Sequence, residues 1–490
     1  MLATMIVTTS RDADAAEHPN IVIILADDMG YGDVQALNAE STIPTPHLNQ
    51  LARQGIVFTD GHSPSAVCTP TRYGLVTGRY CWRSSLKSGV LGGYSPPLLE
   101  RDRPTIASML KANGYRTKAI GKWHLGMQLP TLSDEADRAR WDGDPGIDWG
   151  GKILDSPVHH GFDEYFGVSA SLDMAPYVFI RNDGFSQRPS LQQPAVAFPH
   201  FVRQGPRAEE FVIDGVLDRL IHEAQQFIAT SAPRPEPFFL YLPLTAPHKP
   251  AQPHERFRSK TKRGEYGDFV AQVDWSVGRV LQALRDAGVE DETLVVYTSD
   301  NGSYMKRLPE KQAADHVTDS NQQGYFAKHH RANGPFRGTK ADIWEAGHHV
   351  PLLVRWPGQV QAGSQCDQPV CLTDLYATCA RVVGATLTPG EAPDSFAINQ
   401  LLAGENVARP EPVVHHSVAG MFAIRDGEWK LIAGNGSGGR ELPKGKPFGK
   451  PYQLFNLAQD RAENTDVSEH HPEVVRQLTA RLTELIELDR

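Results

Sequence analysis

Residues 20–28, Asn-Ile-Val-Ile-Ile-Leu-Ala-Asp-Asp, decide the fold, because an apolar run ends there abruptly in two carboxylates. Ile21 to Ala26 lack the alternation of a strand with one solvated face, so they predict a strand buried on both faces, as in a parallel sheet covered by helices. In such sheets ligands bind beyond the carboxyl ends of the strands. Asp27 and Asp28 therefore stand where a functional site is expected.

Three further apolar runs end in polar residues in the same way. With the residues that follow them, they are 293–298 leading to Asp300 and Asn301, 238–242 leading to His248, and 117–120 leading to Lys122 and His124. Because the carboxyl ends of parallel strands share one edge of a sheet, these separate segments are expected to converge on one crevice. If its segment is extended, Lys122 and His124 also point to the same side.

The oxygen atoms at two of these strand ends indicate a metal site. Asp27, Asp28, Asp300 and Asn301 offer only carboxylate and amide oxygens, which favours a hard cation, calcium or alternatively magnesium. Each pair taken alone also fits a helix cap or a turn, where Asp and Asn are common. Two pairs at matching strand ends favour the metal.

One thiol lies where a helix is expected to begin. Residues 68–72 read Cys-Thr-Pro-Thr-Arg; Pro70 fits a first helical turn and Gly78 fits the helix end. Free backbone N–H groups and the positive end of the helix dipole make that position an anion site, to which Arg72 adds a positive charge. A sulfate or a phosphate would suit it. The alternative is that Cys68 is a buried, inert thiol.

The Cys-x-Pro-x-Arg pattern, followed by Thr77-Gly78-Arg79, resembles the signature of the type I sulfatases, the formylglycine-dependent arylsulfatase family of the alkaline-phosphatase-like superfamily. Residues 121–126, 248–250 and 338–358 are similar to other segments of that family, and the resemblance runs from about residue 19 to nearly the end. His348 and His349 stand where an arginine is frequent, and we expect this departure to tune the rim of the pocket.

The resemblance implies a role for each matched residue. The catalytic set is Cys68, Arg72, Lys122, His124, His248 and Lys340; the metal set is Asp27, Asp28, Cys68, Asp300 and Asn301; the substrate-binding set is Lys122, His248, Lys340 and, from a weaker match, Ser171. A formylglycine-generating enzyme would oxidise Cys68 to an aldehyde, whose hydrate attacks sulfur while Arg72 steadies it. His248 would protonate the leaving alcohol, and His124 would take the proton that lets sulfate leave.

The predicted fold class is α/β, a large mixed, mostly parallel sheet sandwiched by helices, with a smaller C-terminal antiparallel sheet plus a helix. Residues 421–432 predict a hairpin that turns at Asp426-Gly427, and 452–457 predict a further strand. Pro472 opens a last helix with one apolar face. We divide the chain into a signal-peptide remnant or disordered tail (1–18), a catalytic domain (19–390) and a C-terminal α+β subdomain (391–490).

The composition of the chain limits which molecules it is expected to bind. The 490 residues are 40% hydrophobic and carry a net charge of −9, which disfavours nucleic acid and anionic membranes, so any positive charge for an anionic substrate must be local. No apolar run approaches the ~20 residues of a membrane span. The apolar start and the small residues 13–16 favour export, to the periplasm or outside the cell. The cysteines are expected to be mostly buried free thiols.

The predicted function is therefore a sulfuric ester hydrolase that acts on a sulfated small molecule or glycan. A sulfated carbohydrate is favoured because residues 128–160, 178–208 and 303–336 interrupt the scaffold with aromatic and cationic side chains. Two alternatives remain open: a phosphoester or phosphonate ester hydrolase of the same fold, and a non-catalytic protein that binds sulfated glycans.

Overall fold

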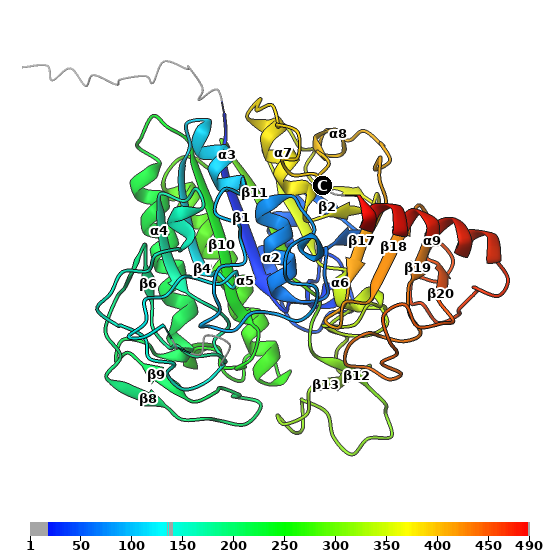
Figure 1. Ribbon diagram of the computed structural model, residues 1–490, viewed down its shortest axis with the longest axis horizontal. Coiled ribbons are helices and arrows are strands. Elements are labelled where there is room, and N and C mark those ends of the chain that lie inside the picture. The colour runs from blue at the N-terminus through cyan, green and yellow to red at the C-terminus, as the bar shows by residue number, and fades with distance from the viewer. Residues whose placement is uncertain (1–17, 135, 137–140, 489–490) are drawn as a thin grey trace, which may run out of the picture.

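The computed structural model describes residues 18–134, 136 and 141–488, and a large mixed sheet forms its centre (Figure 1). Among these residues ten strands make up that sheet, in the spatial order β15 (Ser364–Cys366), β2 (Ile56–Phe58), β14 (Leu352–Arg355), β11 (Thr293–Ser299), β1 (Asn20–Asp27), β10 (Phe238–Pro247), β4 (Arg116–Lys122), β5 (Glu164–Val168), β6 (Ile180–Arg181) and β7 (Gly184–Phe185).

The uninterrupted apolar runs form the parallel centre of this sheet, as the sequence predicted. β1 pairs in parallel with β10 on one side and with β11 on the other, and β10, β4 and β5 continue the parallel order. Every residue of β1, β10 and β11 is buried, because helices cover both faces. The strands β14 and β2 at one side, and β6 and β7 at the other, join in antiparallel orientation and make the sheet mixed.

Two helical layers enclose the sheet. One layer contains α1 (Pro46–Gln54), α4 (Val216–Ser231) and α5 (Gly264–Asp286), of which α4 and α5 pack on β10 and α1 packs on β14 and α5. The other layer contains α2 (Cys68–Thr77), α3 (Ile106–Ala112) and α7 (Asp374–Val382), which pack on one another. The predicted α/β sandwich is confirmed.

A separate antiparallel sheet follows near the C-terminus, drawn in orange and red in Figure 1. Its strands are β17 (Val413–His416), β18 (Phe422–Asp426), β19 (Trp429–Ile432) and β20 (Gln453–Asn456), and α9 (Pro472–Glu487) packs against it. The predicted hairpin, strand and helix are confirmed, whereas β17 was not predicted. The sheet closes its apolar surface on Tyr80 and Trp82 on one side and on Ile343 and Trp344 on the other.

Short elements complete the described chain: β3 (Gly61–His62), β8 (Leu191–Gln193), β9 (Gly205–Arg207), β12 (Lys306–Leu308), β13 (Gly324–Phe326), β16 (Val370–Cys371), α6 (Glu345–His348), α8 (Asn399–Leu402) and the 3-10 helices η1 (Tyr31–Asp33), η2 (Cys81–Arg83), η3 (Pro157–His159), η4 (Ile213–Gly215) and η5 (Glu255–Phe257). The five cysteines are free and four are buried, as predicted. Within the described ranges no helix is long and apolar enough to cross a membrane. The predicted tail, residues 1–18, lies outside the described residues except for its last position.

Candidate active site

The four strand ends converge at one edge of the sheet, as the sequence predicted. Asp27 is the last residue of β1, Lys122 is the last of β4, and His248 directly follows β10. Metal-ligating atoms of Asp27, Asp28, Cys68 and His248 all lie within 4.8 Å of one another. A parallel sheet brings its carboxyl ends together whatever their separation in sequence, and this produces the cluster.

Cys68 is the first residue of α2, which confirms the predicted helix start. Gly78 ends the helix in a left-handed conformation, φ 62°, in which a residue with a Cβ is disfavoured. The thiol is 2% exposed, and burial raises its pKa. Lys340 donates to the Cys68 sulfur from 3.6 Å. The predicted sulfate-binding lysine and the predicted nucleophile are therefore adjacent although 272 residues separate them.

Each predicted metal carboxylate is held by a cation. Lys122 Nζ lies 3.0 and 2.8 Å from the two oxygens of Asp27, and Lys340 Nζ lies 2.5 Å from Asp28 Oδ1. The same Asp28 oxygen accepts a 2.7 Å hydrogen bond from the Asn301 side-chain amide. The predicted sulfate ligands and the predicted metal ligands thus form one hydrogen-bonded group.

Arg72 completes this group by binding Asp300. Its Nε and Nη2 donate to Asp300 Oδ2 at 3.0 and 2.7 Å, and its Nη1 donates to the Lys122 carbonyl at 2.8 Å. The guanidinium is fully buried, and Arg72, followed by Lys122, lowers the pKa of Asp300 against the opposing effect of burial. Arg72 therefore fixes a carboxylate beside the thiol through two charge-assisted hydrogen bonds to one of its oxygens.

Charges in the group balance. Three carboxylates, Asp27, Asp28 and Asp300, face the three cations Arg72, Lys122 and Lys340, so these side chains carry no net charge when all three carboxylates are ionised. Burial raises the pKa of Asp27 to about 7, although Lys122 opposes the shift. A divalent cation would stabilise the ionised carboxylates and would make the site positive overall, as an anion-binding site requires.

Four buried polar atoms near this group have no hydrogen-bond partner among the described residues: Asn301 Oδ1, His124 Nδ1, Ser171 Oγ and Asp173 Oδ1. An unpaired buried polar atom is costly in a folded protein, so a water molecule or a ligand is expected to satisfy these atoms. Asn301 Oδ1 is an oxygen of the predicted metal set. The residues present therefore fit a hard divalent cation.

The two predicted catalytic histidines are engaged through different ring nitrogens. His248 Nδ1 donates to the Lys249 carbonyl at 2.6 Å, which turns Nε2 toward Asp28 Oδ2 at 3.6 Å. His124 Nε2 donates to the Leu91 carbonyl at 2.7 Å, so Nδ1 is the nitrogen without a partner. Burial first, and neighbouring cations second, lower the pKa of both rings.

Two expectations from sequence were wrong. The segment around Lys122 is not extended as far as His124, because β4 ends at Lys122 and His124 has a left-handed φ of 58°. His348 and His349 do not lie at a pocket rim; both are fully buried and contact Glu345, and His348 also contacts Lys430 of β19. Their position is the junction with the C-terminal sheet, which sequence spacing alone did not show.

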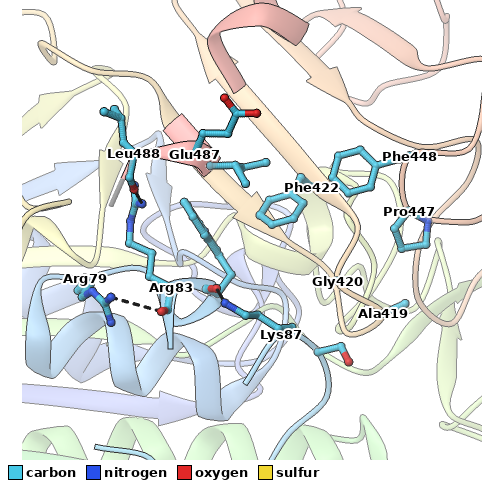
Figure 2. Close-up of a pocket in the computed structure, with 13 residues that line it drawn as sticks. Arg79, Arg83, Lys87, Ala419, Gly420, Phe422, Pro447, Phe448, Glu487 and Leu488 are labelled. Carbon is cyan, nitrogen blue, oxygen red and sulfur yellow. Dashed lines mark hydrogen bonds between the residues drawn. The ribbon is translucent and has the colours of Figure 1, made fainter. Parts of the chain in front are cut away.

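A cavity of about 630 Å³ lies near the far end of α2 (Figure 2). Arg79, Arg83, Lys87, Phe422 and Phe448 are among its lining residues. Two of its cations have internal partners: Arg83 binds Asp394 at 2.9 Å, and Lys87 donates to the Trp82 carbonyl at 2.6 Å. Its lining contains no residue predicted for the site.

Comparison with known proteins identifies the family. The profile of the sulfatase family matches residues 19–385. This chain belongs to the sulfatase family. An N-acetylgalactosamine-6-O-sulfatase of Bacteroides thetaiotaomicron is 31% identical over 500 residues, covering 95% of this sulfatase and 92% of the relative. Human arylsulfatase A is 31% identical over 427 residues, covering 85% of this chain and 75% of its own length.

Comparison with solved structures agrees with this family assignment. A solved structure from work on the metabolism of multiple glycosaminoglycans by Bacteroides thetaiotaomicron superposes with a TM-score of 0.82 at 28% identity, covering 96% of this chain and all of that one. The protein is an enzyme, a sulfuric ester hydrolase of the alkaline-phosphatase-like fold, and the resemblance inferred from Cys68 to Arg72 is confirmed. Sulfatases are generally metal-dependent, and the cluster of Asp27, Asp28, Cys68 and His248 could hold a metal ion.

Sequence analysis missed Asp173 and Arg203 as parts of this region. Asp173 Oδ1 lies 3.8 Å from His248 Nδ1, and Arg203 holds the other carboxylate oxygen at 2.5 Å. Asp173 lies only two residues after Ser171, in a segment already matched to the family. Arg203 lies in a loop, where side-chain direction leaves no periodic signal.

Proposed function

We propose that this sulfatase removes a sulfate ester from a carbohydrate, with residue 68 in its formylglycine form and a divalent cation beside it. The carbohydrate assignment is supported by the name of the N-acetylgalactosamine-6-O-sulfatase that matches nearly the whole chain. The observation that carries the mechanism is the position of Lys340, which contacts Cys68 and Asp28 at once. It joins the proposed nucleophile, the metal ligands and the sulfate site into one unit.

Asp27, Asp28, Asp300, Asn301 and residue 68 would hold the cation, which we propose to be calcium, with magnesium as the alternative. Its donors are hard oxygens, and the buried Asn301 Oδ1 has no other partner within the described chain. When bound, the ion supplies positive charge that screens the sulfate and favours an ionised oxygen at residue 68. The formylglycine supplies a hydrated aldehyde, which, unlike a serine, has a second hydroxyl through which sulfate can be expelled.

Lys122 and Lys340 bind and orient the sulfate oxygens in this proposal. Both ammonium groups are buried and are already directed at the cluster by Asp27 and Asp28. Fixed cations that require no reorganisation stabilise the charge that develops as the ester bond breaks. Arg72 supports the sulfate site indirectly, because it donates hydrogen bonds to Asp300 and to the backbone carbonyl of Lys122. Ser171 offers a buried hydroxyl with no partner in the described chain as an additional sulfate contact.

The hydrogen bonds of the two histidines leave one ring nitrogen of each, His248 Nε2 and His124 Nδ1, available for proton transfer. With Nδ1 donating to Lys249, His248 turns Nε2 toward Asp28; Nε2 carries a proton only in the imidazolium form, and in that form His248 delivers it to the leaving alcohol. With Nε2 donating to Leu91, a neutral His124 presents the lone pair of Nδ1 and accepts the proton whose removal releases sulfate. His248 is thus the acid and His124 the base.

The proposal also includes the setting of the enzyme. A sulfated glycan or small molecule is the substrate, and a formylglycine-generating enzyme acts on Cys68 before folding closes the site. The apolar residues at the start of the sequence and the small residues 13–16 support a periplasmic or secreted enzyme. We divide it into a catalytic domain at 19–390 and a subdomain at 391–490; the subdomain packs through Ile343 and Trp344 on the segment that carries Lys340.

Mass spectrometry and paired substrates test the proposal. The peptide that contains residue 68 should show the mass loss of a thiol converted to an aldehyde. Cys68→Ala should abolish turnover, and Cys68→Ser should nearly do so. The wild-type enzyme should hydrolyse N-acetylgalactosamine 6-sulfate or another sulfated sugar much faster than the matching phosphate ester. Faster phosphate turnover would favour the phosphoester hydrolase, and full activity of Cys68→Ala would end the mechanism.

A further inference from the structure

Asp173 is a buried carboxylate beside the proposed reaction centre, and only one of its two oxygens has a hydrogen-bond partner among the described residues. Asp173 is 1% exposed. One of its oxygens accepts from Arg203 Nη1 at 2.5 Å, while Oδ1 has no hydrogen-bond partner among the described residues. A buried carboxylate oxygen without a donor is destabilising, so its retention indicates a donor that arrives with a ligand.

The position of Oδ1 identifies which part of a ligand it meets. It lies 3.8 Å from His248 Nδ1, beyond hydrogen-bonding distance, and that nitrogen already donates to the Lys249 carbonyl. Asp173 therefore does not orient the imidazole in the way a catalytic carboxylate does. Oδ1 thus lies on the Nδ1 side of the His248 ring and not on the Nε2 side that faces the leaving oxygen. The group that it meets is therefore a neighbour of the leaving oxygen, whereas Lys122 and Lys340 contact the carboxylates of the proposed metal site.

We propose that Asp173 Oδ1 accepts a hydrogen bond from a hydroxyl or amide N–H of the leaving sugar, close to the carbon that bears the sulfate. The inference rests on the proposed function. An ionised carboxylate only accepts hydrogen bonds, so the ligand must supply the donor. A leaving group without a donor, such as an arene or a sterol, leaves Oδ1 unpaired and is bound less well. Asp173 thus selects for a polyhydroxylated leaving group.

Arg203 is the positioning residue of this subsite. Beyond the bond to Oδ2, its backbone N–H and Nη1 donate to the Asp173 carbonyl at 3.1 and 3.2 Å. Its guanidinium lies over the rings of Trp141 and Phe201, at 5.1 and 5.0 Å. Trp141 and Arg203 are half-buried whereas Asp173 is buried, so the subsite extends from the reaction centre toward the surface. Aromatic rings at such a rim provide flat faces on which a sugar can pack.

Substrate pairs test the inference. The probes are N-acetylgalactosamine 6-sulfate, its analogues lacking one hydroxyl or the acetamide, and 4-nitrophenyl sulfate. Asp173→Ala should lower the ratio of kcat/KM for the sugar to that for the aryl sulfate by roughly 10- to 100-fold, the range of one hydrogen bond to a charged group. With the wild-type enzyme, kcat/KM should be lower by a similar factor for the one analogue that lacks the donor. With Asp173→Ala, that analogue and the parent sugar should have similar kcat/KM values. Asp183→Asn, an exposed carboxylate that pairs with Lys152, is the control and should leave both substrates unchanged.

Arg203→Ala should raise KM for the sugar more than it lowers kcat, and Arg203→Lys should restore part of the loss. Equal losses on both substrates for Asp173→Ala would overturn the inference and leave the proposed function standing. So would a wild-type enzyme that treats every analogue like the parent sugar, a measurement that does not depend on the variant folding. If the wild-type enzyme hydrolyses the aryl sulfate but none of the sulfated sugars, both the carbohydrate assignment and this inference are wrong.

Discussion

Replacing Lys340 by methionine should separate the charge of this residue from its bulk. Lys340 Nζ lies 3.6 Å from the Cys68 sulfur and 2.5 Å from Asp28 Oδ1, and the residue is 5% exposed. At an effective dielectric constant of about 20, a unit charge 3.6 Å from a developing negative charge contributes roughly 4 to 5 kcal/mol. We therefore expect Lys340→Met to lower kcat/KM by about 10³-fold.

The assay compares kcat/KM for a sulfated sugar and for 4-nitrophenyl sulfate, with circular dichroism and metal analysis of the same samples. Lys444→Met, which changes an exposed lysine of the C-terminal subdomain, is the control and should behave like the wild-type protein. Inorganic sulfate should also inhibit the Lys340→Met enzyme more weakly. A loss below tenfold in a folded, metal-containing variant would refute the assignment of Lys340 to the sulfate.

The remaining predictions concern the metal, the histidines and the C-terminal junction. Chelation, or Asp300→Ala, should remove activity, and calcium should restore the chelated protein; normal hydrolysis by metal-free enzyme would contradict the site. His248→Ala should reduce turnover of sugar sulfates far more than of aryl sulfates, and His124→Ala should trap sulfated enzyme at residue 68; equal losses without an adduct would reverse the assignments. Burial lowers the pKa of His416 to about 4, below the ~6.5 of the unfolded chain. The neutral imidazole therefore adds about 3 kcal/mol to the free energy of unfolding above pH 6.5, and this contribution is lost as the pH falls toward 4. In urea titrations, the difference in the free energy of unfolding between pH 7 and pH 4.5 should be smaller for His416→Gln than for the wild-type protein. Lys430→Met should cost about 3–5 kcal/mol, because Lys430 is the cation that contacts the buried carboxyl groups of both Glu345 and Glu463, and an unchanged urea midpoint would show that these contacts contribute little.

Sequence could predict the convergence of the site because a single rule sets it. The apolar run before Asp27 and the run before Asp300 each identify a buried strand, and a parallel sheet brings their ends together. The start of α2 at Cys68 was also predictable, because Pro70 and Gly78 mark its two ends. Neither prediction needed knowledge of which side chain contacts which.

The contacts that individual side chains make could not be predicted in the same way. Arg72 lies one turn after Cys68, which correctly places it near the thiol, but its donors bind Asp300, 228 residues away. His124 turns out of the strand through a left-handed residue that no alternation pattern indicates. His349 reads as part of a loop after the lysine segment, yet Glu345 and the Thr59 carbonyl bind its two nitrogens in the interior. Such contacts depend on the packing of distant elements, which local periodicity does not encode.

The pairing of Lys122 with Asp27 and of Lys340 with Asp28 links the proposed metal to the proposed substrate. In the protein alone each ammonium group is bound by a carboxylate that we assign to the cation. A divalent ion bound to these carboxylate oxygens would weaken their hold on the two lysines and would give the balanced cluster a positive charge, and both effects would favour a sulfate. By thermodynamic linkage, sulfate must then tighten the metal by the same factor by which the metal tightens sulfate. The lysines would therefore serve both ligands in turn: they hold the buried carboxylates in the protein alone, and they would bind the anion once the proposed metal takes those carboxylates.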